Sequence, residues 1–309
     1  MFSTVSIERE LIKKEKYKKL YTELTFDEVA KVNGVLLEAL LKLDKVCREN
    51  NLKYMLFAGG LIGAVRNGRC IPWDDDIDVI MPRSDYKKLG QIISEKESKD
   101  WILMYPEDNS VITLGAHFYN KNIKLSELLQ TKIADTKVFE TYIYIDIQPI
   151  DLCSDNRFID WLKGHLVDLL AVSYTSRRCF KKNDLLINIM AKESFKLRVN
   201  LWLRKILAIP TLFISKKRLF QWIDKILSSS HGKKMATPAL GAVHYFGEAM
   251  PYDVWFPINE IELEGHMIMC PQSPELYLKH RYGDYKKIPT LSEQKERMRR
   301  LKSDWESYL

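Results

Sequence analysis

The sequence predicts an α+β protein in which a mixed β-sheet is flanked by helices and carries a basic helical insertion. Three observations lead to this prediction. A strand, a glycine pair and a helix start succeed one another in residues 53–66, and an acidic segment at residues 74–78 leads into a second apolar strand. Residues 158–234 then change to a basic, helical pattern with interleaved tryptophan and phenylalanine. Apolar periodicity of this kind is the main sequence indicator of secondary structure.

The first predicted helix covers residues 26–50. Thr25 and Glu28 have the spacing of a capping box, in which each side chain bonds the backbone N–H of the other residue. Apolar residues then recur at the spacing of three and four that places them on one helix face: Val29, Val32, Leu36, Leu40, Leu43 and Cys47. We expect this face to pack on the sheet.

Residues 53–66 form a possible anion site. Residues 53–58 have the pattern of a strand, Gly59 and Gly60 that of a tight turn, and a short helix should begin at Leu61. The free N–H groups at a helix start can hold an anion such as phosphate. A glycine pair alone is common in turns that bind nothing, so this prediction depends on the neighbouring acidic segment.

The acidic segment supports the prediction, because residues 74–78 contain four aspartates. So much crowded negative charge is unfavourable unless a cation neutralises it, and carboxylate oxygens suit Mg²⁺ or Mn²⁺. Alternate residues of a strand share a face, so Asp76 and Asp78 should point one way and Ile77 and Val79 into the core. The pattern predicts a metal site, against the alternative of a solvated acidic turn.

Other aspartates could complete this site. Asp74, Asp76 and Asp78 are alternate residues, so Asp74 could bind the same metal ion. We expect either Asp74 or Asp75 to support the loop. Asp146 is a lone acid in an apolar strand, which normally requires a partner. We expect it to face Asp76 and Asp78 as a third carboxylate, with a buried ion pair as the alternative. Asp151 is predicted to be a turn residue.

The remaining elements of the core are a helix at residues 85–97 and strands at residues 101–105, 111–120 and 141–148. A glycine cradle with an Asp-x-Asp strand within about twenty residues after it is typical of a nucleotidyltransferase-type fold. We therefore expect a single catalytic domain over residues 1–309. Its nucleotidyltransferase-like core comprises residues 25–157 and 235–309, and the basic helical insertion comprises residues 158–234.

The segment LDKVCRENNLKYMLFAGGLIGAVRNGRCIPWDDDIDVIMPRSDYKKL, residues 43–89, closely resembles the LicD family of phosphocholine transferases, which are related to the fukutin proteins. Three later stretches, YIDIQPID, LEGH and YLKHRYGDY, also resemble that family. The resemblance extends over roughly residues 30–155 and 250–290, and its most specific part is Arg66 together with residues 71–78.

The sequence departs from the family pattern at three places. Leu61 stands where the family has a threonine after the glycine pair, and Gln148 where it has a phenylalanine before the proline. The tail after Pro289 lacks the family's second proline and downstream histidine. The loss of the threonine hydroxyl shifts the expected phosphate contact to backbone N–H groups, and these changes leave the substrate open.

The resemblance implies transfer of phosphocholine from CDP-choline to a sugar hydroxyl of a lipopolysaccharide, teichoic acid or capsule precursor. Catalysis would rest on Asp76, Asp78 and Asp146, and Mg²⁺ or Mn²⁺ would be held by these three with Asp74. Gly59, Gly60 and Arg66 would bind the donor phosphates. Asp146, or a hydroxide held by the metal, would accept the proton of the attacking hydroxyl.

Further residues are candidates for contact with the donor or the acceptor. Arg66 could pair with phosphate or form a salt bridge with an aspartate. Trp73 has the character of a packing residue, although its ring could stack on a base or contact a quaternary ammonium. His117, Glu264 and Tyr282 are further candidates for contact with donor or acceptor.

Composition limits the class of protein. The five cysteines are scattered and form no CxxC pair, which favours a reducing compartment. The N-terminal residues are charged, and no window of about 18 apolar residues occurs. We therefore expect a cytoplasmic protein, which could associate peripherally with the inner face of the cell membrane.

The net charge of +7 is unevenly distributed. Residues 177–234 contain 15 Lys or Arg and three acidic residues, a local net charge of +12. This segment could be a solvated helical cap, or a surface that contacts anionic lipid or a lipid-linked glycan. No nucleic-acid recognition motif accompanies the charge, so no nucleic-acid partner is expected.

Two alternatives stay open. The same site could transfer another phospho-alcohol, such as phosphoethanolamine, an alditol phosphate or a phosphonate. A catalytically inactive, membrane-associated scaffold is the other, although the intact Asp76 and Asp78 argue against it.

Overall fold

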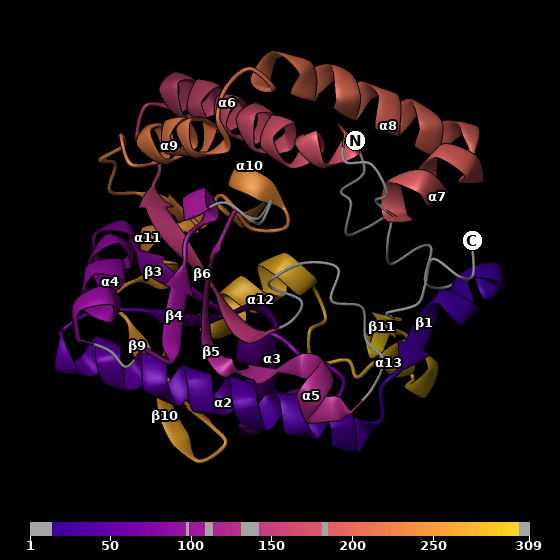
Figure 1. The fold of residues 1–309 in the computed structure, drawn as a ribbon. Helices are drawn as coiled ribbons and strands as arrows, with labels where there is room; N and C mark the ends of the chain where they lie inside the picture. Colours follow the sequence, from indigo (N-terminus) through magenta and orange to yellow (C-terminus); the bar gives the residue numbers. More distant parts are fainter. Residues whose placement is uncertain (1–13, 97–98, 109–113, 131–141, 181–184, 303–309) are drawn as a thin grey trace.

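A seven-stranded mixed sheet organises the chain in the computed structural model, which describes residues 14–96, 99–108, 114–130, 142–180 and 185–302 (Figure 1). Its main path runs in the order β2 (Met55–Phe57), β3 (Ile77–Pro82), β6 (Tyr142–Leu152), β5 (Ala116–Lys124) and β4 (Trp101–Met104). Strand β7 (Met235–Thr237) pairs with the end of β6, and β8 (Met250–Pro251) pairs with β7. Strands β3 and β6 are parallel, and the other pairs are antiparallel. The predicted α+β architecture with a mixed sheet is confirmed.

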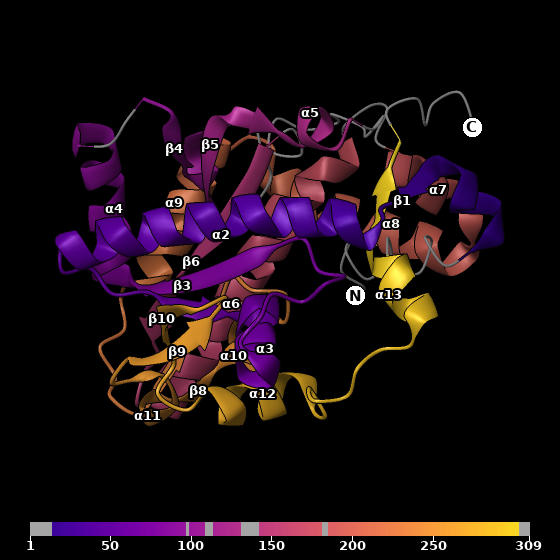
Figure 2. The same cartoon turned by 90° about the horizontal axis from the view of Figure 1, so that it is seen from below.

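Helix α2 (Phe26–Glu49) lies across one face of the sheet (Figure 2). The Thr25 hydroxyl accepts a hydrogen bond from Glu28 N at 3.2 Å, and Thr25 N donates to Glu28 Oε2 at 2.7 Å, so the predicted capping box is present. All six apolar residues of the predicted face are buried. The local cap and the periodic apolar face together explain why this segment is helical and why it packs here.

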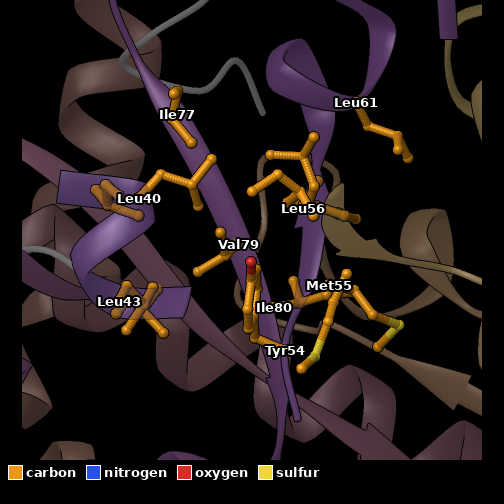
Figure 3. Close-up of a cluster of buried hydrophobic side chains, with 14 of the residues drawn as sticks. Leu40, Leu43, Tyr54, Met55, Leu56, Leu61, Ile77, Val79 and Ile80 are labelled. Carbon is orange, nitrogen blue, oxygen red and sulfur yellow. The ribbon is translucent and has the colours of Figure 1, made fainter. Parts of the chain in front are cut away.

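The main core lies between α2 and the first two strands of the sheet (Figure 3). Leu40 and Leu43 of α2 belong to the same buried cluster as Leu56 of β2 and Val79 of β3. Burial of a side chain of this size contributes roughly 1.5–3 kcal/mol. The core therefore fixes which face of β3 turns toward α2, and Asp78 lies on the opposite face, which it shares with the buried Ile80.

Helices α6 (Arg157–Ser176), α7 (Leu185–Glu193), α8 (Phe195–Ala208) and α9 (Lys216–Leu227) form a separate layer on the side of the molecule opposite α2 (Figure 1). This layer has its own apolar cluster, which includes Val167, Tyr174, Leu219 and Ile223. None of the described helices is long and apolar enough to cross a membrane.

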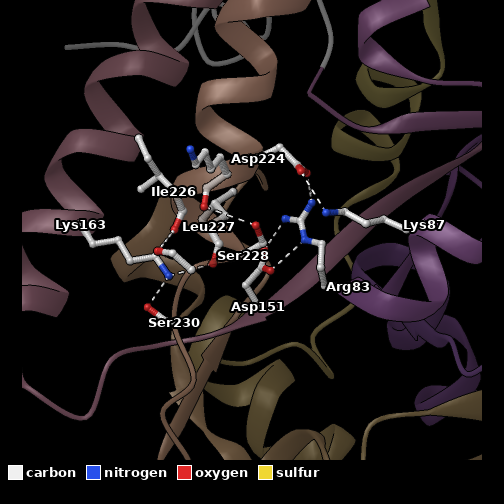
Figure 4. A network of polar contacts seen from close by, with 11 residues as sticks. Arg83, Lys87, Asp151, Lys163, Asp224, Ile226, Leu227, Ser228 and Ser230 are labelled. Carbon is white, nitrogen blue, oxygen red and sulfur yellow. Dashed lines mark hydrogen bonds and ion pairs between the residues drawn. The ribbon is translucent and has the colours of Figure 1, made fainter.

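An ion-pair network joins this helical layer to the sheet (Figure 4). Arg83 donates from Nε to Asp151 Oδ1 at 2.8 Å and also pairs with Asp224 of α9. Lys87 Nζ lies 3.3 Å from Asp224 Oδ2. Lys163 of α6 donates to Leu227 O at 2.8 Å. Buried, bidentate pairs of this kind hold two elements in one orientation.

The C-terminal part returns to the sheet and then to the start of the chain. It contains α10 (His244–Glu248), α11 (Tyr252–Trp255), β9 (Asn259–Leu263), β10 (His266–Cys270), α12 (Pro274–Tyr282) and α13 (Leu291–Arg297). Strand β11 (Arg299–Leu301) pairs antiparallel with β1 (Tyr21–Glu23). The other described elements are α3 (Ala58–Asn67), α4 (Arg83–Lys96), α5 (Leu125–Leu129) and the 3₁₀ turns η1 (Glu15–Leu20), η2 (Pro106–Asp108), η3 (Arg177–Phe180) and η4 (Ile209–Thr211).

Three predicted boundaries are wrong. Helix α3 begins at Ala58 rather than Leu61, so Gly59 and Gly60 lie in its first turn and form no separate tight turn. Strand β5 extends to Lys124 instead of ending at residue 120, while the predicted residues 111–113 lie outside the described residues. Strand β6 continues past Pro149 to Leu152, because β3 and then β7 supply backbone partners on this stretch.

Asp151 is consequently no turn residue. It lies within β6, 4% exposed, and its carboxylate is held by Arg83. The prediction considered only the proline before it, whereas the bidentate partner comes from residue 83, which local sequence does not reveal.

Candidate active site

Three polar residues form a row across the middle of the sheet. Asp78 of β3 is the register partner of Asp146 of β6, and Asp146 is also the register partner of His117 of β5. Neighbouring strands lie about 5 Å apart, and paired residues project from the same face of a sheet. The fold therefore brings Asp146 beside Asp78, where the sequence analysis expected a third carboxylate.

The burial pattern of β3 explains why Asp78 faces away from the core. Ile77 and Val79 are 2% and 0% exposed, which agrees with the predicted alternation. Ile145 and Ile147 flank Asp146 in the same way and are fully buried. Both aspartates thus occupy the polar position of an apolar, alternating strand, and the parallel register aligns the two positions.

Asp74 and Asp76 reach the site by a different route, because both lie in the loop before β3 and not on the strand. A Cβ atom added at Gly59 would lie 2.3 Å from Asp74 Oδ2 and 3.7 Å from Asp76 Oδ1. The two carboxylates therefore sit against the first turn of α3, and the absence of a side chain at Gly59 leaves room for them. Because Asp74 is not in a strand, the expected alternation of side chains does not explain its position. Its carboxylate still lies near that of Asp76.

The pKa values of Asp78 and Asp146 are both raised above the ordinary value of an aspartate. Burial raises the pKa of the Asp146 carboxyl to about 7. Burial raises the pKa of Asp78 well above its usual range, and the charges of Asp146, Asp74 and Glu248 raise it further. Asp146 Oδ1 is buried without a hydrogen-bond donor. A buried carboxylate oxygen with no donor is unfavourable, so this position suits an added cation.

Gly115 makes the close surroundings of Asp146 possible. A Cβ atom at this residue would lie 2.0 Å from Asp146 Oδ1 and 3.3 Å from Ile147 O. Only a residue without a side chain fits here while Asp146 keeps its present position. Gly115 and Gly59 therefore have equivalent roles on the two sides of the aspartate group.

His117 closes the row at the side of β5. It is 1% exposed, and its ring stacks on Tyr144 with centroids 4.2 Å apart. Burial lowers the pKa of His117 to about 4, so the imidazole is neutral at physiological pH. Its position next to Asp146 keeps it as a candidate, although its burial is also that of a structural histidine.

Glu248 is a further acidic residue that the sequence analysis missed. It ends α10, is 2% exposed, and its Oε1 lies 3.3 Å from Arg281 Nε, while Oε2 is buried without a hydrogen-bond partner. Its charge raises the pKa of Asp78, which places it within electrostatic reach of the aspartate pair. The surrounding sequence has no repeating pattern, so only the fold brings this residue to the site.

Two tyrosines of α12 lie near the same carboxylates. Burial raises the pKa of the Tyr277 hydroxyl, and the charges of Glu248 and Asp78 add to this effect. The Tyr277 ring stacks on Phe57, the register partner of Asp78, with centroids 4.9 Å apart. Tyr282 is 39% exposed and also feels the charge of Asp78. Tyr282 is therefore an accessible aromatic ring near Asp78, whereas Tyr277 and Phe57 belong to the core.

Arg66 has a role that neither expectation described. Its Nε donates to Tyr285 O at 2.7 Å, and its Nη2 donates to Lys287 O at 3.0 Å. Within the described ranges it forms no ion pair with an aspartate, so that alternative is not observed. Arg66 ties α3 to the segment after α12, and this segment includes part of the motif that resembles the LicD family.

Two other candidates support the loops around the site. Glu264 Oε1 accepts a hydrogen bond from Cys70 N at 2.8 Å, and Glu264 N donates to Gly68 O at 2.7 Å. Glu264 therefore fixes the loop after α3, which is a structural role. Asp75 pairs with Arg300 of β11, the supporting role expected for one aspartate of the loop. Trp73 is half-buried and packs against the main core.

One groove at the surface lies away from the aspartate row. A groove of about 370 Å³ between α4 and α9 is lined by Tyr86, Tyr105 and Phe220 among others. Its lining contains none of the predicted site residues. The chemistry of the aspartate row, and not the size of this groove, therefore defines the candidate site.

The candidate site thus combines aspartates paired across neighbouring strands of a mixed sheet with a helix start that contains Gly59 and Gly60. Residues 51–111 match the family described as LicD/FKTN/FKRP, nucleotidyltransferase domain. The resemblance to the LicD family is therefore confirmed over these residues. The matched residues include Gly59, Asp74, Asp76 and Asp78.

Two relatives extend the comparison. The lipopolysaccharide cholinephosphotransferase LicD of Haemophilus influenzae is 24% identical over 265 residues, which cover 84% of this chain and 92% of that protein. An uncharacterized protein of Rickettsia prowazekii is 34% identical over 91 residues, which cover 28% of this chain and 34% of that protein. The first similarity includes most of the chain, so it is not limited to the aspartate loop.

Proposed function

We propose that this chain transfers phosphocholine from CDP-choline to a hydroxyl group of a glycan, such as a lipopolysaccharide, teichoic acid or capsule precursor. The observation that carries the proposal is the register pairing of Asp78 with Asp146, in a chain that resembles a cholinephosphotransferase over most of its length. Clustered carboxylates without a cation are unfavourable, which favours a catalytic site over an inactive scaffold.

The donor set fits Mg²⁺ or Mn²⁺. No three His, Cys, Asp or Glu side chains form a ready metal cage within the described segments. Mg²⁺ commonly binds one or two carboxylates, with substrate phosphates and water completing its shell. Asp78 and Asp146, with Asp76 and Asp74 beside them, therefore fit an ion that binds together with the donor diphosphate. The ion would neutralise the charge that develops on the departing CMP.

The chain's own residues bind the donor and accept the proton. The backbone N–H groups of Gly59 and Gly60 in the first turn of α3 would hold phosphate oxygens. The acceptor oxygen forms a new bond to the phosphorus that carries choline, and the bond from that phosphorus to the oxygen of CMP breaks. The acceptor proton passes to a carboxylate, for which Asp146 and Glu248 are the candidates.

The proposal that the head group is choline rests on the similarity to the cholinephosphotransferase LicD, and not on the residues of the site. The aromatic rings beside Asp78 are mostly buried in the core, and Tyr282 is the exposed one among them. A single accessible ring does not make an aromatic cage for a quaternary ammonium. Phosphoethanolamine, an alditol phosphate or a phosphonate could use the same site.

The test is a donor panel with the purified chain and a glycan acceptor extract. CDP-choline, CDP-ethanolamine and CDP-ribitol are each supplied with Mg²⁺, and release of CMP and the mass added to the acceptor are measured. We expect CMP release and the mass of phosphocholine from the first donor. If only another donor supports transfer, the head group is that of this donor and not choline. If no donor gives CMP release with any acceptor, the proposed function is wrong.

A further inference from the structure

Helix α8 buries two polar residues beside Leu201 and Ala208, and it exposes large apolar side chains. Its inward face contains Asn200 and Arg204, which are 6% and 4% exposed, and Arg204 Nη1 donates to Ser176 Oγ at 3.3 Å. Its outward face contains Phe195 and Trp202, which are 75% and 62% exposed. A helix on the surface of a globular protein normally has the opposite arrangement. The exposed side of α8 therefore carries more large apolar side chains than that of an ordinary surface helix.

The same feature continues on both sides of α8. Helix α6, which lies beside α8 in the outer layer of Figure 1, exposes apolar residues from its first turn onward. We define the apolar outer face as the exposed large side chains of α6, α8 and the turn after α8: Phe158, Ile159, Trp161, Leu162, Leu166, Leu169, Phe195, Val199, Trp202, Leu203, Ile206, Ile209, Leu212 and Phe213. Monomeric soluble proteins rarely expose so many apolar side chains on neighbouring elements unless that surface binds something.

Cations accompany this face, and the nearby acids are already paired. Lys196, Arg198, Lys217 and Arg218 are exposed on α8 and α9. Among the described residues of 177–234 the acids are Glu193 and Asp224. Glu193 pairs with Lys14 and Lys16, and Asp224 pairs with Arg83 and Lys87, all from outside the segment. Both described acids of residues 177–234 are thus paired with cations from outside the segment, and the segment keeps a large excess of Lys and Arg.

We propose that the apolar outer face docks on the surface of an anionic phospholipid bilayer. Exposed tryptophan, phenylalanine and leucine side chains would enter the boundary between head groups and acyl chains, while the lysines and arginines contact lipid phosphates. A second copy of the chain is a poor occupant, because two such faces would bring the same cations together. The helices lie on the membrane surface in this arrangement and do not cross it.

The proposal does not depend on the proposed function, since it concerns the helical layer and not the aspartate row. It has a consequence for that function, because a chain held at a bilayer would meet acceptors that are linked to lipid. The candidate active site lies in the sheet that this layer covers, and Arg83 connects the two through Asp151 and Asp224. Docking would therefore position the site at a fixed distance from the bilayer.

The test is co-sedimentation of the full chain with vesicles of phosphatidylcholine alone and of phosphatidylcholine mixed with phosphatidylglycerol. We expect binding to the anionic vesicles and weak binding to the neutral ones. The double variant Phe195→Gln/Trp202→Gln should lower the partition coefficient by about tenfold or more. The double variant Arg198→Gln/Lys217→Gln should lower it by about tenfold and reduce its dependence on salt.

Matched controls change equally exposed residues on other surfaces. Met267→Gln/Leu291→Gln controls for the loss of apolar side chains, and Lys31→Gln/Lys45→Gln on α2 controls for the loss of charge. Both controls should bind vesicles as the wild type does, and thermal unfolding checks that every variant is folded. Failure of the wild type to bind anionic vesicles would overturn the proposal. Equal binding to both vesicle types, or self-association through Trp202 without vesicle binding, would overturn it as well.

Discussion

Asp78 and Asp146 are paired in register on two parallel strands, so two carboxylates that are 68 residues apart in the sequence meet on one face of the sheet. Each lies between buried apolar neighbours, and the local sequence therefore fixes its direction. The parallel alignment of β3 with β6 fixes the pairing. An arrangement that brings two acids together in a shielded position stores repulsion, which a bound cation would relieve.

Replacing Asp146 should raise stability when no divalent metal is present. The folded-state pKa of Asp146 is about 7 against an ordinary value of 3.8, so the unfolded chain binds fewer protons between these values. Stability of the wild type should therefore fall as the pH rises from about 4 to about 7. Asp146→Asn lacks this effect and should be more stable near neutral pH by up to about 4 kcal/mol.

Urea unfolding in the presence of a chelator, near pH 5 and near pH 7, measures this effect. The gap between Asp146→Asn and wild type should be wider at the higher pH. Asp253→Asn, at an exposed position on α11, serves as the control and should behave like the wild type. If the free energy of unfolding differs between Asp146→Asn and wild type by the same amount at both pH values, the pKa of Asp146 is not raised in the folded protein.

Gly59→Ala should impair the site without unfolding the protein. The new Cβ would lie 2.3 Å from Asp74 Oδ2, and the end of a side chain can move away at little cost. We expect an unchanged melting temperature and a rise in KM for the donor by about tenfold, because Asp74 is displaced from its place beside α3.

The control for this variant is Gly34→Ala on α2, where a Cβ would have nothing within 4 Å. That change should increase stability by about 0.5–1 kcal/mol, as alanine does in a helix interior, and leave turnover unaffected. Normal donor kinetics in a folded Gly59→Ala protein would mean that Asp74 has no part in donor binding.

Glu248→Gln should lower turnover more than donor affinity. The amide keeps the size of the side chain but removes the charge that raises the pKa of Asp78, and it cannot accept a proton as the carboxylate can. We expect kcat to fall by about tenfold or more, with KM for CDP-choline close to that of the wild type. Steady-state kinetics measure both constants. The control is Glu275→Gln, which changes an exposed acid on α12. An unchanged kcat would assign Glu248 a structural role with Arg281.

Arg66→Ala distinguishes a structural role from phosphate binding. The two carbonyl groups that Arg66 now bonds, at Tyr285 and Lys287, would lose their donor, so stability should fall by about 1–3 kcal/mol. Arg69→Ala, at an exposed neighbouring position, should have little effect. If KM for the donor rises strongly while stability stays unchanged, Arg66 contacts phosphate and its observed bonds are secondary.

Much of the fold can be predicted from local sequence patterns. The capping box at Thr25, the apolar face of α2 and the alternation around Asp78 are each determined by residues within a few positions of one another, and all were predicted. The position of Asp146 beside Asp78 was also predicted, because a lone acid in an apolar strand needs a partner and the family resemblance suggested which one.

The errors occurred where distant residues decide the local structure. Asp151 belongs to a strand because β7 pairs with it and Arg83 holds its carboxylate, and neither partner is close in sequence. Glu248 is brought to the site by α10 and Arg281, without any motif of its own. Helix α3 includes Gly59 and Gly60 because its first turn packs against the aspartate loop, an arrangement that glycine propensity alone opposes.

The most direct test of the account is the release of CMP from CDP-choline by wild type and Asp78→Asn, measured while Mg²⁺ is titrated. We expect that release by the wild type requires Mg²⁺ and that the folded Asp78→Asn protein shows at most about a thousandth of that rate at any Mg²⁺ concentration. Release that persists in a chelator, or that is undiminished in Asp78→Asn, would contradict the assignment of the Asp78 and Asp146 pair as the centre of catalysis.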